Sequence, residues 1–261
     1  MEQTAPHPRA VHVEHCMGTV FSIDIRDPGV WRPAVAEAVA LLHHVDATFS
    51  TYREDSVISR LGRNELELED TPAEVQEALA LCSGIGSDSG GFFSVTAAGR
   101  LDPSGLVKGW AIERVSDLLR DHGSRNHAVN GGGDLQLAGE RSPGRPWRIG
   151  INDPTRPGRL VTVVSVRDAA VATSGTAERG CHVTDPVTGR PATELASVTV
   201  FGRHLTYVDA YATAALAMGH QCRSWLECLP GHEGITVSAD GTRWESGGMP
   251  AWTTRPRPRA G

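Results

Sequence analysis

The sequence has a single lysine, Lys108, whereas arginine supplies the other 24 of its 25 basic side chains. An ammonium group is a compact point charge and a guanidinium group is a planar fork, so the two do different chemistry. The lone lysine is therefore either a product of chance and codon bias or a position that requires an ammonium group. Its sequence context has to decide between these two explanations.

The sequence also lacks any long apolar run. Stretches such as Val161–Val166 and Ala38–Leu42 are far shorter than the roughly 20 residues that cross a bilayer as a helix, which excludes a membrane-spanning segment. Residues 1–8 have neither a basic start nor an apolar core followed by a cleavage site, as a secretion signal has. We therefore expect a cytoplasmic protein.

Paired cysteines and an excess of positive charge are missing as well. The five cysteines form no C-x-x-C pair and are odd in number, so we expect mostly buried free thiols rather than disulfides or a cysteine-rich zinc site. The formal charge of −6 argues against binding to a nucleic acid through its phosphates. The absence of G-x-G-x-x-G, G-x-x-x-x-G-K-[ST], H-E-x-x-H and G-x-S-x-G weakens the dehydrogenase, P-loop, zincin and hydrolase hypotheses.

What is present predicts one domain between two tails. Residues 1–10 and 253–261 are rich in proline and charge, so we predict disordered tails that flank a single domain over residues 11–252. Helical spacing of apolar residues predicts helices at 33–47, 72–85, 106–122, 208–218 and 224–229. Short β-rich runs predict strands at 18–25, 128–130, 147–152, 160–166, 169–173, 196–201 and 234–238. This order is typical of an α+β fold.

The single lysine stands in an unusual context. Residues 101–111 read Leu-Asp-Pro-Ser-Gly-Leu-Val-Lys-Gly-Trp-Ala and lead into the helix predicted to end near His122. A turn that enters a helix offers backbone N–H groups and a partial positive charge to an anion, and a lysine there strengthens such a site. The context favours a binding role for Lys108 over an exposed lysine after an Asp-Pro turn. A second segment, Gly131–Gly133, fits either a tight turn or a ligand loop.

Two later segments carry candidate polar groups. His182 and Asp185 could form a base with an orienting acid, a metal pair, or a hydrogen-bonded turn that ends at Gly189. Asp209 and Thr213 are four residues apart, so they share one face of a helix. Their hard oxygen atoms suit Mg²⁺ better than zinc. The alternative is a helix-capping aspartate and a threonine bonded to its own turn.

Taken in order, these segments resemble the ApbE family of flavin transferases. The resemblance includes Met-Gly-Thr-Val-Phe-Ser at 17–22 and Phe-Ser-Thr-Tyr-Arg-Glu-Asp-Ser at 49–56, and it extends from about Met17 to Gly241. It implies an α+β fold with helices packed on a mainly antiparallel or mixed β-sheet and a flavin site in a central cleft. It also implies an Mg²⁺-dependent FAD:protein FMN transferase, which moves FMN from FAD to a threonine or serine hydroxyl of an acceptor flavoprotein and releases AMP.

The family pattern, carried over residue by residue, implies two groups of binding residues. Flavin contacts fall at Met17, Tyr52, Phe92, Phe93, Asp102, Lys108 and Val183. The metal falls between the backbone carbonyl of Gly105, the Asp209 carboxylate and the Thr213 hydroxyl. The catalytic candidates are Lys108, which would neutralise phosphate charge, and His182, supported by Asp185, which would accept or orient the acceptor's proton.

The chain departs from the family pattern on the flavin side. Phe92 and Asp102 are only ten residues apart, whereas most relatives have a longer segment there. Phe93 stands where relatives often have Asp, and Pro103-Ser104 stands where they often have Leu-Gly. These departures concern the surroundings of the flavin ring, while the phosphate and metal end of the pattern is intact.

Two alternative functions remain open at the level of sequence. The same site could hydrolyse FAD to FMN and AMP, with water in place of the acceptor hydroxyl. The chain could also be a non-catalytic protein that binds or stores flavin. Storage would not need the Asp209–Thr213 pair, because it requires no metal ion at a pyrophosphate, and AMP release from FAD would separate it from both reactions.

Overall fold

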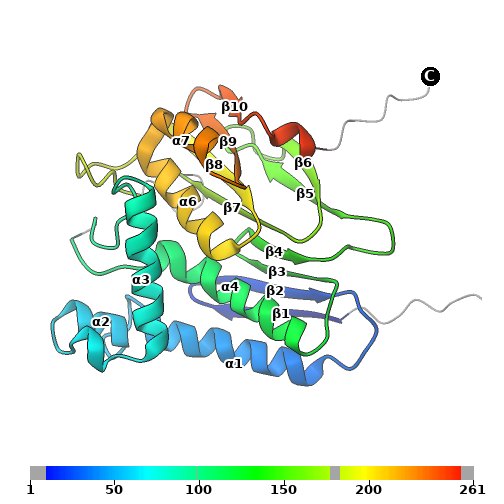
Figure 1. Cartoon of the computed structure of the whole chain (residues 1–261), viewed down its shortest axis with the longest axis horizontal. Coiled ribbons are helices and arrows are strands. Elements are labelled where there is room, and N and C mark those ends of the chain that lie inside the picture. Colours follow the sequence, from blue (N-terminus) through cyan, green and yellow to red (C-terminus); the bar gives the residue numbers. More distant parts are fainter. Residues whose placement is uncertain (1–9, 98, 177–182, 254–261) are drawn as a thin grey trace, which may run out of the picture.

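The computed structural model describes residues 10–97, 99–176 and 183–253. Its centre is an eight-stranded sheet in the order β1-β2-β3-β4-β7-β8-β9-β10 (Figure 1). The strands are β1 (Ala10–Cys16), β2 (Thr19–Ile25), β3 (His127–Gly131), β4 (Asp134–Ala138), β7 (Ala169–Gly175), β8 (Leu195–Gly202), β9 (Glu233–Ser238) and β10 (Arg243–Glu245). Every neighbouring pair is antiparallel. Together with the helices, this sheet confirms the α+β class.

The middle of the sheet separates two hydrophobic cores. Successive side chains of a strand point to opposite faces, so one strand can supply both cores. In β8, Val198 and Val200 pack with the helices, whereas Phe201 packs against a second, two-stranded sheet. That second sheet consists of β5 (Trp147–Asn152) and β6 (Leu160–Val166). The middle strands are therefore covered on both faces.

Helices cover the other face of the large sheet (Figure 1). They are α1 (Arg32–Phe49), α2 (Val57–Gly62), α3 (Ala73–Asp88), α4 (Ser104–Asp121), α6 (Leu205–Met218) and α7 (Cys222–Cys228), with short 3₁₀ turns η1 (Leu68–Asp70), η2 (Gly219–Gln221) and η3 (Met249–Ala251). The glycines after α4 and α6, Gly123 and Gly219, have φ values of 93° and 63°, as expected for glycines that end helices.

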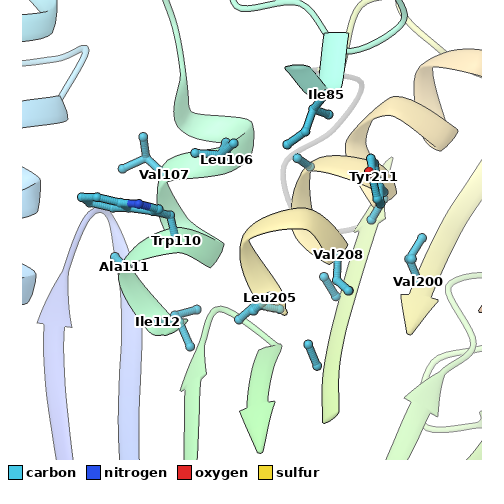
Figure 2. Close-up of a cluster of buried hydrophobic side chains, with 14 of the residues drawn as sticks. Ile85, Leu106, Val107, Trp110, Ala111, Ile112, Val200, Leu205, Val208 and Tyr211 are labelled. Atoms are coloured by element: carbon cyan, nitrogen blue, oxygen red, sulfur yellow. The ribbon is translucent and has the colours of Figure 1, made fainter. Parts of the chain in front are cut away.

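Helices α4 and α6 position the part of the molecule that matters most below. Figure 2 shows Leu106 and Ile112 of α4 in one cluster with Leu205 and Val208 of α6 and Val200 of β8. All five side chains are buried. α6 is rich in alanine, whose small side chain allows a neighbouring backbone to approach. The packing brings the N-terminal halves of the two helices together.

Three strands, β1, β4 and β10, lie outside the sequence prediction. In β1, Val11 and Val13 are 52% and 54% exposed, so its valines face solvent and its alternation is inverted relative to an ordinary half-buried strand. β4 follows Gly132–Gly133, whose φ values of 60° and 96° form a tight hairpin turn. The glycine run therefore forms a tight turn, and a further role as a ligand loop stays a prediction.

The predicted thiols and tails fall partly within the described residues. Cys16, Cys82 and Cys222 are buried free thiols, and Cys228 is exposed. Cys181 and most of both predicted tails lie outside the described residues. In the described part of the chain, no helix has the length and apolar character needed to cross a membrane.

A buried histidine ties β3 to α4. His127 is fully buried, with Nε2 at 2.8 Å from Ser116 Oγ and Nδ1 at 2.9 Å from Ser124 Oγ. Burial disfavours the charged imidazolium and lowers the pKa of His127 from 6.5 to about 4. Between these two values the unfolded chain takes up a proton that the folded chain does not. This group therefore destabilises the fold as pH falls through that window.

We expect His127 to account for about 2 kcal/mol of stability lost between pH 7 and pH 4.5. A His127→Gln variant keeps a polar side chain but does not titrate, so its unfolding free energy should fall less steeply over the same range. Urea unfolding at both pH values measures the difference, because all other groups contribute equally in the two proteins. Equal losses in both proteins would contradict the prediction.

Candidate functional site

Asp209 of α6 and Lys108 of α4 meet although 100 residues separate them in sequence. Asp209 is buried, and its Oδ2 accepts a hydrogen bond from the Gly109 N–H at 2.9 Å. Lys108 Nζ lies 3.2 Å from Oδ2 and 3.3 Å from Oδ1 of the same carboxylate. The only lysine of the chain is thus part of a buried ionic cluster, which excludes the exposed-lysine alternative.

The structure also excludes the helix-capping explanation for Asp209. α6 begins at Leu205, one turn before Asp209. The carboxylate of Glu113 takes the capping role instead, since its Oε2 accepts hydrogen bonds from the Thr206 N–H at 2.9 Å and the Thr206 hydroxyl at 2.6 Å. Asp209 is therefore directed at α4 rather than at its own helix end.

Thr213, one turn after Asp209, lies near Gly105, one turn before Gly109. Its hydroxyl oxygen is 3.3 Å from Ser174 Oγ at the end of β7. A Cβ atom on Gly105 would lie 3.2 Å from the Phe93 ring and 3.4 Å from Thr213 Cγ2, so glycine allows this close approach. The structure thus brings Gly105, Asp209 and Thr213 to the same α4–α6 contact.

Asp134 completes the ionic cluster and is absent from the residues predicted for the site. It begins β4, is buried, and forms an ion pair with Lys108 Nζ. Its Oδ1 also accepts a hydrogen bond from the Thr173 N–H of β7 at 2.9 Å. The available sequence signal was an acid placed directly after three glycines, which could not show the direction of its side chain.

The predicted flavin contacts are less closely gathered. Phe93 adjoins the cluster through Gly105, but Tyr52 is 90% exposed, with the Arg100 guanidinium 5.8 Å from its ring centre. Asp102 Oδ1 accepts a hydrogen bond from the Ser104 N–H at 3.0 Å, at the start of α4. The other predicted contacts are the half-buried Met17 and Phe92 and the buried Val183. The assignment of all these residues to flavin binding stays a prediction.

Asp185 forms a turn of its own. Its Oδ1 accepts a hydrogen bond from the Val187 N–H, and its Oδ2 accepts one from the Thr188 hydroxyl, both at 2.8 Å. The Thr188 hydroxyl is the main cause that lowers the pKa of Asp185. His182 lies outside the described residues, so its role and the support it receives from Asp185 stay predictions.

Two surface hollows lie away from this cluster. One of about 410 Å³ adjoins Trp31 and His122, and one of about 350 Å³ adjoins Tyr207 and Tyr211. At 100° per residue, Tyr207 and Tyr211 lie on the side of α6 opposite Asp209. The polar contacts of α4, α6 and β4 therefore locate the candidate site, and these hollows do not.

The oxygen atoms near Lys108 are the ones that could hold a metal ion. Among the described residues, no group of three or more His, Cys, Asp or Glu side chains is arranged to bind one. The predicted donor set instead combines the Asp209 carboxylate with the Thr213 hydroxyl and the Gly105 carbonyl. A hard cation such as Mg²⁺ accepts such oxygen donors and completes its shell with water and phosphate oxygens.

Gly109 offers a test of how tightly the two helices are fixed. A Cβ atom there would lie 2.6 Å from the Leu205 carbonyl oxygen and 2.7 Å from Asp209 Cβ. We expect Gly109→Ala to destabilise the fold by about 1–3 kcal/mol, because overpacking outweighs the gain in helix propensity of roughly 1 kcal/mol. Thermal and urea unfolding measure this change.

Gly84 of α3 provides the matched control. It is an exposed helical glycine, and nothing lies within 4 Å of the position its Cβ would take. Gly84→Ala should therefore stabilise the fold by roughly 0.5–1 kcal/mol through helix propensity alone. If the two alanine variants were equally stable, the close α4–α6 contact would be wrong.

Comparisons with known proteins give consistent results. The model of the ApbE family matches residues 17–100 and 96–236. A protein of Vibrio cholerae named FAD:protein FMN transferase is 28% identical, with 78% of this chain and 80% of that protein aligned. A Treponema pallidum protein of the same name is 31% identical over 65% of this chain and 54% of its own length. The solved structure of the ApbE protein from Thermotoga maritima superposes with a TM-score of 0.86 at 21% identity, covering 95% of this chain and all of that one.

Proposed function

Because the chain belongs to the ApbE family, we propose that it is an FAD:protein FMN transferase. In this reaction a threonine or serine hydroxyl of an acceptor flavoprotein attacks the FMN phosphate of FAD, and AMP leaves. The observation that carries the proposal is the convergence of Lys108, Asp209 and Thr213 where α4 meets α6. Cleavage of a pyrophosphate needs positive charge beside ordered oxygen ligands; Lys108 can provide the first, and Asp209 and Thr213 can provide the second.

The donor set fits Mg²⁺. The Asp209 carboxylate, the Thr213 hydroxyl and the Gly105 carbonyl are hard oxygen donors, and a Cβ atom on Gly105 would lie 3.6 Å from the Thr213 hydroxyl oxygen. When bound, Mg²⁺ would supply charge neutralisation to the pyrophosphate of FAD. Dependence on Mg²⁺ is part of this proposal.

The other roles in the proposed reaction belong to side chains and backbone groups of this chain. The ammonium of Lys108 would bind a phosphate oxygen and stabilise the charge that develops on the leaving AMP. The Gly109 N–H holds the Asp209 carboxylate in orientation, at 2.9 Å. His182 would accept the proton of the acceptor hydroxyl, and Phe93 would lie beside the flavin. The cytoplasmic location expected from the sequence also belongs to the proposal.

The test combines the protein with FAD, Mg²⁺ and a purified acceptor domain that carries a flavinylation site. Flavin fluorescence that stays with the acceptor after denaturing electrophoresis measures transfer, and chromatography measures AMP. The matched reactions omit the acceptor or replace Mg²⁺ with EDTA. Labelled acceptor and AMP in equal amounts, only with Mg²⁺, are the expected result.

The same reactions separate the alternatives. AMP and free FMN in equal amounts without acceptor would indicate hydrolysis of FAD. Tight binding of FAD with no AMP under any condition would indicate storage. No contact among the described residues favours either alternative. The similar proteins of Vibrio cholerae and Treponema pallidum are named as transferases.

A further inference from the structure

Asp134 is a buried acid with an unusual position in the ionic cluster. Its side chain is 2% exposed, and its carboxylate is paired with the same Lys108 ammonium that contacts Asp209. Two carboxylates from β4 and α6 therefore share one ammonium, and the cluster of three groups has a net charge of −1. The Lys108–Asp134 contact is the closer of the two.

A buried charge is costly unless an opposite charge balances it. If Asp134 were neutral, Asp209 would be the one carboxylate of the described residues left in contact with Lys108. The lysine would then neutralise Asp209, and a cation approaching the Asp209 oxygens would be repelled by an ammonium whose charge no second carboxylate balances. The charge of Asp134 thus determines how much negative charge Asp209 can offer to another cation.

We propose that Asp134 is a positioning residue that shares the Lys108 ammonium with Asp209, so that Lys108 does not fully neutralise Asp209 and Asp209 stays able to bind a divalent cation. The inference rests on the proposed function, because it takes Asp209 as a metal ligand. Asp134 does not touch the reacting atoms. It sets the place of the lysine, and through it the strength of the metal site.

Asp134 also has a structural role, and the test must separate this role from the effect of its charge on Asp209. Its Oδ1 accepts the Thr173 N–H and so continues the pairing of β4 with β7 beyond Leu135 and Val171. Asp134→Asn keeps an oxygen acceptor for this hydrogen bond and removes only the charge. Asp134→Glu keeps the charge. The double variant Asp134→Asn with Lys108→Met restores the net charge of −1 by removing both members of the pair.

The experiment titrates each protein with Mn²⁺ alone and follows free Mn²⁺ by electron paramagnetic resonance. We expect Asp134→Asn to weaken Mn²⁺ binding at least ~10-fold, because the site loses one unit charge at short range. Asp134→Glu and the double variant should bind within about threefold of the wild type, although the double variant lacks the lysine needed for transfer. Thermal unfolding of each variant reports stability separately.

Asp153 supplies the matched control. It is another buried carboxylate, paired with Arg243 at 2.5 Å, and it follows β5 on the far side of the sheet. Asp153→Asn should lower stability without changing Mn²⁺ binding. If Asp134→Asn behaves in the same way, Asp134 is structural only and the inference is overturned.

Two further outcomes are informative. Should Asp134→Asn fail to fold, the double variant decides, because it buries no unbalanced ammonium. Binding within about threefold of the wild type then supports the inference, and loss of binding overturns it. If the wild type itself binds no Mn²⁺, the proposed metal site is wrong. If the wild type binds Mn²⁺ and Asp134→Asn binds equally well, only the role of Asp134 is wrong.

Discussion

Replacement of Asp209 by alanine is expected to lower flavin transfer at least ~100-fold, which corresponds to about 2.7 kcal/mol of transition-state stabilisation. The variant removes a charged oxygen from a small cation that depends on few protein ligands. The fold should survive, because Lys108 keeps Asp134 as its counter-charge when Asp209 is lost. Asp209 is itself buried, so survival of the fold depends on this remaining Lys108–Asp134 pair.

The measurement compares initial transfer rates of wild type and Asp209→Ala over a range of Mg²⁺ concentrations. An Asp209→Asn variant of nearly the same shape separates loss of charge from loss of volume, and it should also be slow. Asp117 of α4 provides a surface control, because it is an exposed acid paired only with Arg120 on its own helix among the described residues. Unchanged turnover of Asp209→Ala at limiting Mg²⁺ would remove Asp209 from the metal site.

Replacement of His182 by alanine is expected to slow transfer to the acceptor hydroxyl by roughly 10²–10⁴-fold while FAD binds almost as tightly as before. A general base acts in the transition state, so its loss affects turnover more than substrate binding. The three quantities to measure on the one variant are kcat, the Kd for FAD and the melting temperature.

A structural His182 would give a different pattern. If it only supported the turn that ends at Gly189, the variant would lose thermal stability and FAD affinity together. His220→Ala serves as a control, because His220 is an exposed histidine that follows α6 and lies outside the predicted site. An active, FAD-tight but less stable His182→Ala protein would remove His182 from the mechanism.

Much of the fold could be predicted from sequence because its elements carry strong local signals. The strands 147–152 and 160–166 have the predicted bounds, and α6 differs from its prediction only by an additional first turn. The sequence pattern did not predict β1, because the valines of this strand face solvent and its polar residues face inward. Such an inversion depends on what covers each face, which periodicity alone does not contain.

The site was predictable only in part, for a different reason. Local context pointed to Lys108, Asp209 and Thr213, the resemblance to the ApbE family added Gly105, and the structure brings the four together from two helices that are far apart in sequence. Asp134 was missed because a carboxylate after a glycine turn has no local pattern that reveals its partner. Its pairing with Lys108 depends on the register of β3 and β4 and on where α4 crosses them.

The single lysine has a practical consequence for chemical labelling. In a chain whose other basic side chains are guanidinium or imidazole groups, one Nζ atom accounts for all lysine-directed acylation. That atom lies between Asp134 and Asp209 on a side chain that is only 17% exposed. The mass of the proteolytic peptide that contains Lys108 therefore reports whether a reagent can reach the ionic cluster. Access to the cluster can thus be followed without an engineered tag.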